Sequence, residues 1–483
     1  MPTNFKTFLK LHRVSLILAV LSFIFYYTYA YHLQRTDFVK LLTLFVALFF
    51  FCFKLIQFEK LNFRFLLGLG IIFRLVFLFT EPNLSQDFYR FIWDGHLVAN
   101  GDNPYLHTPD DLIINMVSII PNADVLYEGM GSLSARHYSN YPPLNQLLFA
   151  LASFIGGKSI FGSLLVLRIT IILADIGVFY FGRRLLKNLN KSPHLIFWYF
   201  LNPLVIVELT GNLHFEGVML FFFILSMFLL SINKWKIAGI VIIELTANLH
   251  FEGVMLFFFI LAMFLLSIDK WKTAGIVMAC SISIKLVPLL FLPLFFKYLG
   301  WKKSIIFYSI IGITSIVLFL PFNTPEFIDN YTKTISLWFS NFEFNSSIYN
   351  IAKKIAIHFD AKPWEFIKEY GKITPVLTIV TVALFTLLPK KYDLNRVLWS
   401  MMWVMTIYYF ISTTVHPWYP IFLVLLSIFT TYRYAIIWSA AIVLSYFAYS
   451  QADFNENLWL LGIEYTSVFG FIVYEIVTHH NKK

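Results

Sequence analysis

Of the 483 residues, 59% are hydrophobic and only 13% are charged, so the chain cannot cover a folded core with polar surface, and the composition excludes an ordinary soluble protein. The net charge of +10 fits Lys and Arg gathered in cytoplasmic loops, and we expect no nucleic-acid partner. These features predict an all-α polytopic membrane protein, a bundle of roughly 11 to 14 transmembrane helices in contact with membrane lipid.

Apolar runs recur along the whole chain, separated by short polar turns, and each is long enough to cross a hydrocarbon core. We expect residues 1–483 to form a single integral-membrane domain. The predicted crossings, in chain order, are 15–33, 40–57, 63–80, 160–182, 194–209, 216–232, 253–268, 304–321, 374–388, 397–414, 417–431, 434–449 and 457–477.

Three further segments are too short or too interrupted to be simple crossings. Residues 143–157 are predicted to form a re-entrant or interfacial helix, and residues 237–247 still to cross or nearly cross. Residues 273–296 carry basic residues at both ends, so one crossing would place one basic cluster on the wrong side. We expect two half-helices there, broken near Lys285 and Pro288.

Lys and Arg are distributed unevenly among the predicted loops. If the basic N-terminus is inside, the other basic clusters fall on the same side, and the short loops left outside contain neither residue. This is the positive-inside pattern of membrane proteins. It predicts cytoplasmic N- and C-termini and two long extracytoplasmic loop regions, 81–142 and 322–372, folded over the same opening.

A tandem duplication occupies residues 206–277. Residues 206–241 recur as 242–277 with five differences. Solenoid arrays need at least three units, so this is a local duplication. It places a polar group on the predicted outer side twice. The alternative is a recent genetic or assembly accident with one idle copy, and the sequence does not say which copy lines a site. The two groups are Asn212, His214 and Glu216, and Asn248, His250 and Glu252.

The first long external segment begins with two carboxylates, Asp87 and Asp94. If the segment is helical, a spacing of seven puts both on one face, two turns apart. Aromatic neighbours favour the membrane interface, where a partly desolvated carboxylate suits the removal of a proton from an attacking hydroxyl. The pair could also hold a divalent cation, Mg²⁺ or Mn²⁺. The alternative is two solvated loop acids.

Two other positions suit a phosphate. Lys285 is too far from both basic flanks to reach the cytoplasmic interface, so it is a candidate ligand for an anion, with pairing to Asp175 as the alternative. His416 lies on a predicted outer loop without basic residues, where its aromatic neighbours could equally be interfacial. The duplicated Asn, His and Glu groups are more suited to a sugar or phosphate site than to a metal.

Five segments, in this order, resemble the polyprenyl-phosphate-sugar-dependent glycosyltransferases of the GT-C fold. They are most similar to the mannosyltransferase branch that includes the enzyme adding the first mannose to glycosylphosphatidylinositol, with related bacterial proteins. The sequence departs from that family ahead of Asp87, where Ser85 and Gln86 stand in place of a nearly adjacent second acid. The segments are Asp87–Gly95, Gly101–Tyr105, Tyr141–Leu144, Ser283–Leu289 and His416–Pro420.

The resemblance implies an inverting transfer of a hexose, in this branch mannose, from a polyprenyl-phosphate donor to a lipid- or glycan-linked acceptor. It implies that this occurs at the extracytoplasmic face of a bacterial plasma membrane. Asp87 would be the base, Lys285 would hold the donor phosphate, and Tyr141 would line the substrate site. A transporter or flippase of lipid-linked sugars is the alternative function, because intramembrane charges and broken helices also occur in transporters. An inactive scaffold protein is the third.

Overall fold

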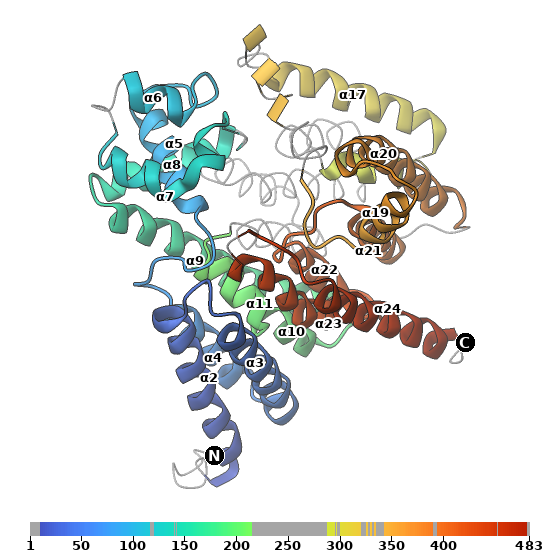
Figure 1. Ribbon diagram of the computed structural model, residues 1–483. Helices are drawn as coiled ribbons and strands as arrows, with labels where there is room; N and C mark the ends of the chain where they lie inside the picture. Colours follow the sequence, from blue (N-terminus) through green and yellow to red (C-terminus); the bar gives the residue numbers. More distant parts are fainter. Residues whose placement is uncertain are drawn as a thin grey trace. The chain divides into compact units, whose positions relative to one another are not determined.

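The chain forms two compact helical units (Figure 1). Unit 1 comprises 1–85, 182–214 and 420–483, and unit 2 comprises 86–181 and 215–419. In the part of the chain that the structure describes, every named element is a helix, which confirms the predicted all-α class. The computed structural model describes residues 10–115, 120–139, 141, 143–214, 287–294, 296, 300–319, 325–326, 329–330, 333–334, 342–389, 394–451 and 453–480.

Five of the described helices are long and apolar enough to cross a membrane, and a bent helix pair makes a sixth candidate. This confirms a membrane protein with several spans. Two predicted crossings, 216–232 and 253–268, lie outside the described residues. The five helices are α2 (Arg13–His32), α3 (Phe38–Glu59), α9 (Ile160–Asn188), α20 (Pro363–Leu387) and α24 (Leu458–His480).

Unit 1 packs its N-terminal and C-terminal helices around aromatic side chains. Helix α2 packs on α3, and α23 packs on α22 and α24. Tyr26, Tyr29, Phe45 and Phe77 are almost fully buried and contact one another at their ring edges or faces. Its other elements are α4 (Phe63–Leu75), η2 (Pro193–Ile196), α10 (Phe197–Phe200), α11 (Pro203–Val205), η3 (Ile206–Gly211), α22 (Pro420–Ile428), α23 (Tyr434–Ala441) and η6 (Ile442–Ser450).

The end of α4 differs from the predicted crossing 63–80. The α-helix ends at Leu75, and the chain continues in tighter turns, in which the Phe77 amide donates to the Arg74 carbonyl over 3.1 Å. Such bonds satisfy carbonyls that the last turn of a helix leaves open. The Arg74 guanidinium is fully buried, donates to the Phe200 carbonyl over 2.9 Å and lies 4.2 Å above the Phe200 ring, so it joins α4 to α10.

The predicted crossing 194–209 is not one straight helix. Its two halves, 193–200 and 203–211, meet at an angle of 53°. Asn202 is extended because Pro203 follows it, and its side-chain oxygen accepts from the Leu204 amide over 2.9 Å, which caps the second half. The helix is therefore broken at Asn202 and Pro203. Two half-helices were predicted for residues 273–296, and within that segment the structure describes η4 (Val287–Leu294), which is 3-10 helix.

Unit 2 contains a cluster of short helices in the predicted first external segment. Helix α5 packs against α7 and α8, and these three lie together in Figure 1. The elements are α5 (Asp87–Ala99), α6 (Pro109–Asn115), α7 (Ala123–Ala135), α8 (Pro143–Gly156), the first part of α9, η4, α17 (Trp301–Phe319), α19 (Ile348–His358), α20 and α21 (Leu394–Ile411).

Helix α20 begins earlier than the predicted crossing 374–388. Its first turns are rich in Lys and Glu, which are good helix formers that hydropathy does not reveal. The exposed pair Glu369 and Lys372, 2.5 Å apart, lies on these turns. Pro375 falls inside the helix, where proline is tolerated in membrane helices. The predicted second external segment, 322–372, therefore includes α19 and the start of α20.

The contact between α5 and α8 depends on Gly95. A Cβ at this position would lie 2.3 Å from the Phe149 carbonyl oxygen and 2.5 Å from the Ser153 hydroxyl, so the α8 backbone would have to move. We expect Gly95→Ala to lower the free energy of unfolding by about 1–3 kcal/mol, as overpacking does. The measurement is Tm of the purified protein in detergent.

The matched control is Gly68→Ala on α4, where nothing lies within 4 Å of the added Cβ. There alanine should keep or slightly raise Tm, because it favours a helix over glycine. Equal Tm values for Gly95→Ala and the wild type would show that the close approach of α5 to α8 is wrong.

Candidate active site

Helix α5 carries the two carboxylates that the sequence predicts for the first external segment. Asp87 is its first residue and Asp94 lies two turns later, so the segment is helical and the condition under which both carboxylates share a face is met. The Asp87 side chain is half-buried, and the Asp94 side chain is fully buried. The position of Asp87 in the first turn favours its ionised form, because the exposed backbone N–H groups there carry partial positive charge.

Asp94 is the centre of a buried polar network. Its Oδ1 accepts from Arg90 Nε over 2.7 Å, and its Oδ2 accepts from the Ser139 hydroxyl over 2.6 Å and from Gln146 Nε2 over 2.9 Å. Arg90 is itself almost fully buried, and its Nη1 donates to the Ser134 carbonyl over 2.7 Å. The network thus ties α5 to the end of α7 and to α8, a structural role for Asp94.

Three of the segments quoted for the family resemblance meet at this network. Gln146 reaches toward the Tyr141 carbonyl, which also accepts from the Tyr105 hydroxyl over 2.6 Å. The Tyr141 ring packs edge-on against Phe91 of α5, at 5.1 Å between ring centroids. The segments 101–105 and 141–144 therefore lie against α5, which itself carries the segment 87–95.

The second predicted external segment touches the first. Asn330 Nδ2 donates to the Tyr105 carbonyl over 3.3 Å. Further along the same segment, Phe344 pairs by its backbone with Thr413 (3.0 Å) and Val415 (2.8 Å). These bonds hold the second segment to the first and to the loop that carries His416.

His416 lies in an aromatic stack. Its ring is parallel to Trp418 at 4.5 Å and meets the edge of Tyr419 at 5.3 Å, with Phe344 at 5.8 Å. All four side chains are in unit 2. This stacking fixes the plane of the His416 imidazole.

Local charge near α5 is set mainly by carboxylates and Arg90. Burial lowers the pKa of His96, in the last turn of α5, so its imidazole favours the neutral form. The hydrogen bond from the Tyr127 hydroxyl to Asp110, 2.9 Å long, raises the pKa of Tyr127. The neutral His96 imidazole therefore adds no positive charge to α5, and the Tyr127 phenol stays protonated.

A divalent cation was one predicted role for the two carboxylates. Among the described residues, no group of three or more His, Cys, Asp or Glu side chains is placed to hold a metal ion. Both oxygens of Asp94 accept hydrogen bonds from Arg90, Ser139 and Gln146. Arg90 therefore supplies a positive charge to Asp94, and Ser139 and Gln146 supply further hydrogen-bond donors.

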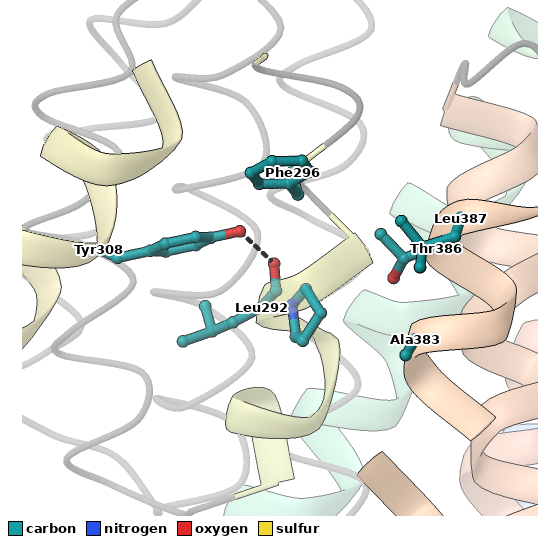
Figure 2. Close-up of a pocket in the computed structure, with 7 residues that line it drawn as sticks. Leu292, Phe296, Tyr308, Ala383, Thr386 and Leu387 are labelled. Atoms are coloured by element: carbon teal, nitrogen blue, oxygen red, sulfur yellow. Dashed lines mark hydrogen bonds between the residues drawn. The ribbon is translucent and has the colours of Figure 1, made fainter. Parts of the chain in front are cut away.

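An apolar pocket of about 510 Å³ opens elsewhere in unit 2, between η4, α17 and α20 (Figure 2). Its polar groups are bonded to the backbone: the Tyr308 hydroxyl donates to the Leu292 carbonyl over 3.0 Å, and the Thr386 hydroxyl to the Val382 carbonyl over 2.7 Å. The lining suits a hydrocarbon chain. The lining residues are Leu292, Pro293, Phe296, Tyr308, Ala383, Thr386 and Leu387.

The remaining predicted residues separate into two groups. Asn212 and His214 are buried in unit 1, where both side chains bond to Glu208, at 3.1 and 2.9 Å. Sequence reasoning did not single out Glu208, although an acid inside an apolar segment is a functional signal in a membrane protein. The residues that lie outside the described part of the chain are Lys285, Glu216, Asn248, His250 and Glu252.

A family model described as "Alpha-(1->6)-mannopyranosyltransferase, N-terminal domain" matches residues 18–264, just over half of the chain. The chain belongs to the MptA_B family. It is also similar to alpha-(1->6)-mannopyranosyltransferase B of Corynebacterium glutamicum, at 26% identity over 149 residues. That match covers 31% of this chain and only 24% of the relative. No solved structure matches.

The MptA_B match includes part of each unit. It contains Asp87, Tyr141 and the Glu208 group, but not Lys285, His416 or the apolar pocket. The family membership confirms the resemblance to mannosyltransferases that the sequence motifs indicate.

We expect Asp94 to contribute strongly to the free energy of unfolding. In Asp94→Asn the buried Arg90 guanidinium loses its carboxylate, and breaking a buried pair from one side costs about 3–5 kcal/mol. We expect a large fall in Tm, or failure to purify. Asp87→Asn, at a half-buried position in the first turn, should cost less than about 1 kcal/mol. A Tm for Asp94→Asn equal to that of Asp87→Asn would contradict the network.

Proposed function

We propose that this chain is a membrane mannosyltransferase of the GT-C type. It moves mannose, with inversion, from a polyprenyl-phosphate donor to a lipid- or glycan-linked acceptor at the extracytoplasmic face. Mannosyl transfer rests on membership of the MptA_B family. The finer assignment is carried by one observation: two further motif segments, 101–105 and 141–144, lie against α5, the helix that carries the first motif and has the half-buried Asp87 at its start.

In this proposal Asp87 is the general base. Its carboxylate takes the proton of an acceptor hydroxyl as that oxygen attacks the anomeric carbon, and a bond forms between them. The bond from the anomeric carbon to the phosphate oxygen breaks, and its electron pair leaves with the polyprenyl phosphate. Attack opposite to the leaving group inverts the anomeric centre.

The donor phosphate needs positive charge as it leaves. We assign this to Lys285, with His416 as a second contact; both lie on segments that resemble the family's motifs. A phosphate on a lipid is already a good leaving group, so the protein has to supply position, one base and cationic stabilisation.

The apolar pocket supports a donor with a lipid chain. It lies beside η4, which follows Lys285 closely in sequence, and its polar lining atoms already bond to the backbone. A polyprenyl chain requires such a surface, because it offers no hydrogen-bonding group.

Asp87→Asn should abolish transfer while keeping the fold. We expect the rate to fall by a factor on the order of 10²–10⁴, the usual contribution of a general base. The assay is release of polyprenyl phosphate from polyprenyl-phosphate mannose by purified protein. The control is Asp124→Asn, the same change at an exposed position in the first turn of α7, which should keep the wild-type rate. Wild-type activity in Asp87→Asn would refute the base.

Filling the pocket should lower kcat/KM for donors that carry a long lipid chain. Ala383→Trp places a large ring in the pocket, whereas Leu384→Trp adds the same ring at the neighbouring, exposed position of α20. We expect Ala383→Trp to lower kcat/KM about tenfold for a full-length polyprenyl donor, close to 1.4 kcal/mol, and little for a donor of two isoprene units. An equal effect on both donors, or an equal effect of Leu384→Trp, would refute the lipid site.

One observation favours the alternative, a transporter or flippase of lipid-linked sugars. The bent pair 193–211 carries a buried acid, and broken helices of this kind line transport sites in other folds. Movement of labelled polyprenyl-phosphate mannose across vesicles containing the protein, with no covalent product when acceptors are present, would establish it.

A further inference from the structure

Helix α19 in unit 2 packs one of its faces on the first turns of α20. Tyr349 is fully buried, and its ring stacks on Phe366 at 5.8 Å between centroids and meets the edge of Tyr370 at 4.9 Å. Ala352, one turn later, packs against the same cluster. The Tyr349 hydroxyl also donates to the Glu343 carboxylate over 2.7 Å. These contacts fix α19 against α20.

A second face of α19 is apolar and exposed. Ile348, Ile351 and Ile355 follow one another at spacings of three and four, which places them on one side of the helix. They are 42%, 63% and 55% exposed, and Phe359, directly after the helix, is 77% exposed. Single exposed apolar residues are ordinary, but a continuous row of them marks an interaction surface. We call the row of Ile348, Ile351 and Ile355 the isoleucine face.

The charges of α19 are all positive. The helix contains Lys353 and Lys354 and no acidic residue. Lys354 is exposed and lies about 100° around the helix from Ile355. Just after α19, the Lys362 ammonium lies 5.7 Å from the ring centroid of Trp364, which is 61% exposed. An apolar face flanked by lysines, with an exposed Trp nearby, is typical of a helix that lies in the surface of a membrane.

The length of α20 indicates the depth at which α19 lies. Its 25 residues span about 37 Å, more than a hydrocarbon core of about 30 Å and close to a whole bilayer of about 40–45 Å. Ile373, Val376 and Ile379 are exposed on its later turns, whereas Glu365 and Glu369 are exposed on its first turns. With the apolar turns in the hydrocarbon, the charged first turns lie at the headgroups. Helix α19 packs on these first turns, so its isoleucine face continues the apolar surface of α20.

Helix α19 is fastened to the loop that carries His416. The Ser347 hydroxyl, just before α19, donates to the Phe410 carbonyl over 2.8 Å. Three residues earlier, the Phe344 carbonyl accepts from the Val415 amide over 2.8 Å. The depth of α19 in a membrane therefore also sets the depth of this loop.

We propose that α19 is an interfacial helix, whose isoleucine face lies between the headgroups and the first carbons of the lipid chains. Lys354 stays among the headgroups, because its long side chain carries the ammonium group toward water. The occupant of the isoleucine face is the bilayer itself. This lipid contact goes beyond the proposed function and does not depend on it.

The test places a fluorescent label at one position of the full chain in phosphatidylcholine nanodiscs that contain a lipid with a nitroxide near its headgroup. The label is attached to Ile355→Cys or, as the matched control on the next residue, to Lys354→Cys, after Cys52 and Cys280 are replaced by alanine. We expect the lipid nitroxide to quench the Ile355→Cys label at least about threefold more strongly than the Lys354→Cys label. Iodide in the water should quench the Lys354→Cys label more strongly.

Two results would overturn the proposal. If iodide quenches both labels equally, the isoleucine face lies in water. If the Ile355→Cys label is protected from both iodide and the lipid nitroxide, protein covers the isoleucine face, either a second copy of the chain or another segment.

A second measurement needs no label. Ile351→Glu puts a charge on the isoleucine face, and Lys354→Glu puts the same side chain on the neighbouring polar side. In lipid nanodiscs we expect Ile351→Glu to lower Tm by several degrees and Lys354→Glu to leave it nearly unchanged, because a charge is costly among lipid chains but not in water. A Tm for Ile351→Glu equal to that of the wild type would contradict the lipid contact. If Ile351→Glu cannot be purified, the quenching comparison decides.

Discussion

The contact between Arg90 and Asp94 is the interaction on which the candidate site around α5 depends. Both side chains are buried, and their bonds reach the segments before and inside α8 as well as the end of α7. A pair of opposite charges away from water is stable only when the remaining polar atoms are also bonded. Because the pair fixes α5, it also fixes the position of Asp87 at the start of that helix.

Buried acids recur among the described residues, and protein donors bond to them. Glu208 in unit 1, like Asp94 in unit 2, accepts hydrogen bonds from several side chains. Trp438 Nε1 donates to Glu464 over 2.9 Å, and Glu475 accepts from the Arg433 and Tyr434 amides. An apolar chain in lipid cannot rely on water to solvate its acids, so side chains and backbone amides supply the donors. Asp87 differs from these acids in being only half-buried at a helix start.

Composition and the spacing of apolar runs were sufficient to predict the helical membrane class, whereas the helical state of the aromatic segment after Ser85 entered only as a condition, which the structure meets. The order of the motifs led to the mannosyltransferase family. Hydropathy could not predict the bend at Asn202 and Pro203, because the run stays apolar through it. It also missed the polar first turns of α20. The family resemblance singled out Asp87 as the base, but the burial of Asp94 could not be predicted from sequence, since its partners Ser139 and Gln146 lie far along the chain.

The close approach of Gly211 to Phe77 has a consequence for how this duplication evolves. An added Cβ at position 211 would lie 3.0 Å from the Phe77 ring, so the segment that carries Gly211 is under a packing constraint at this position. Selection therefore keeps position 211 small, independently of any role in the chemistry.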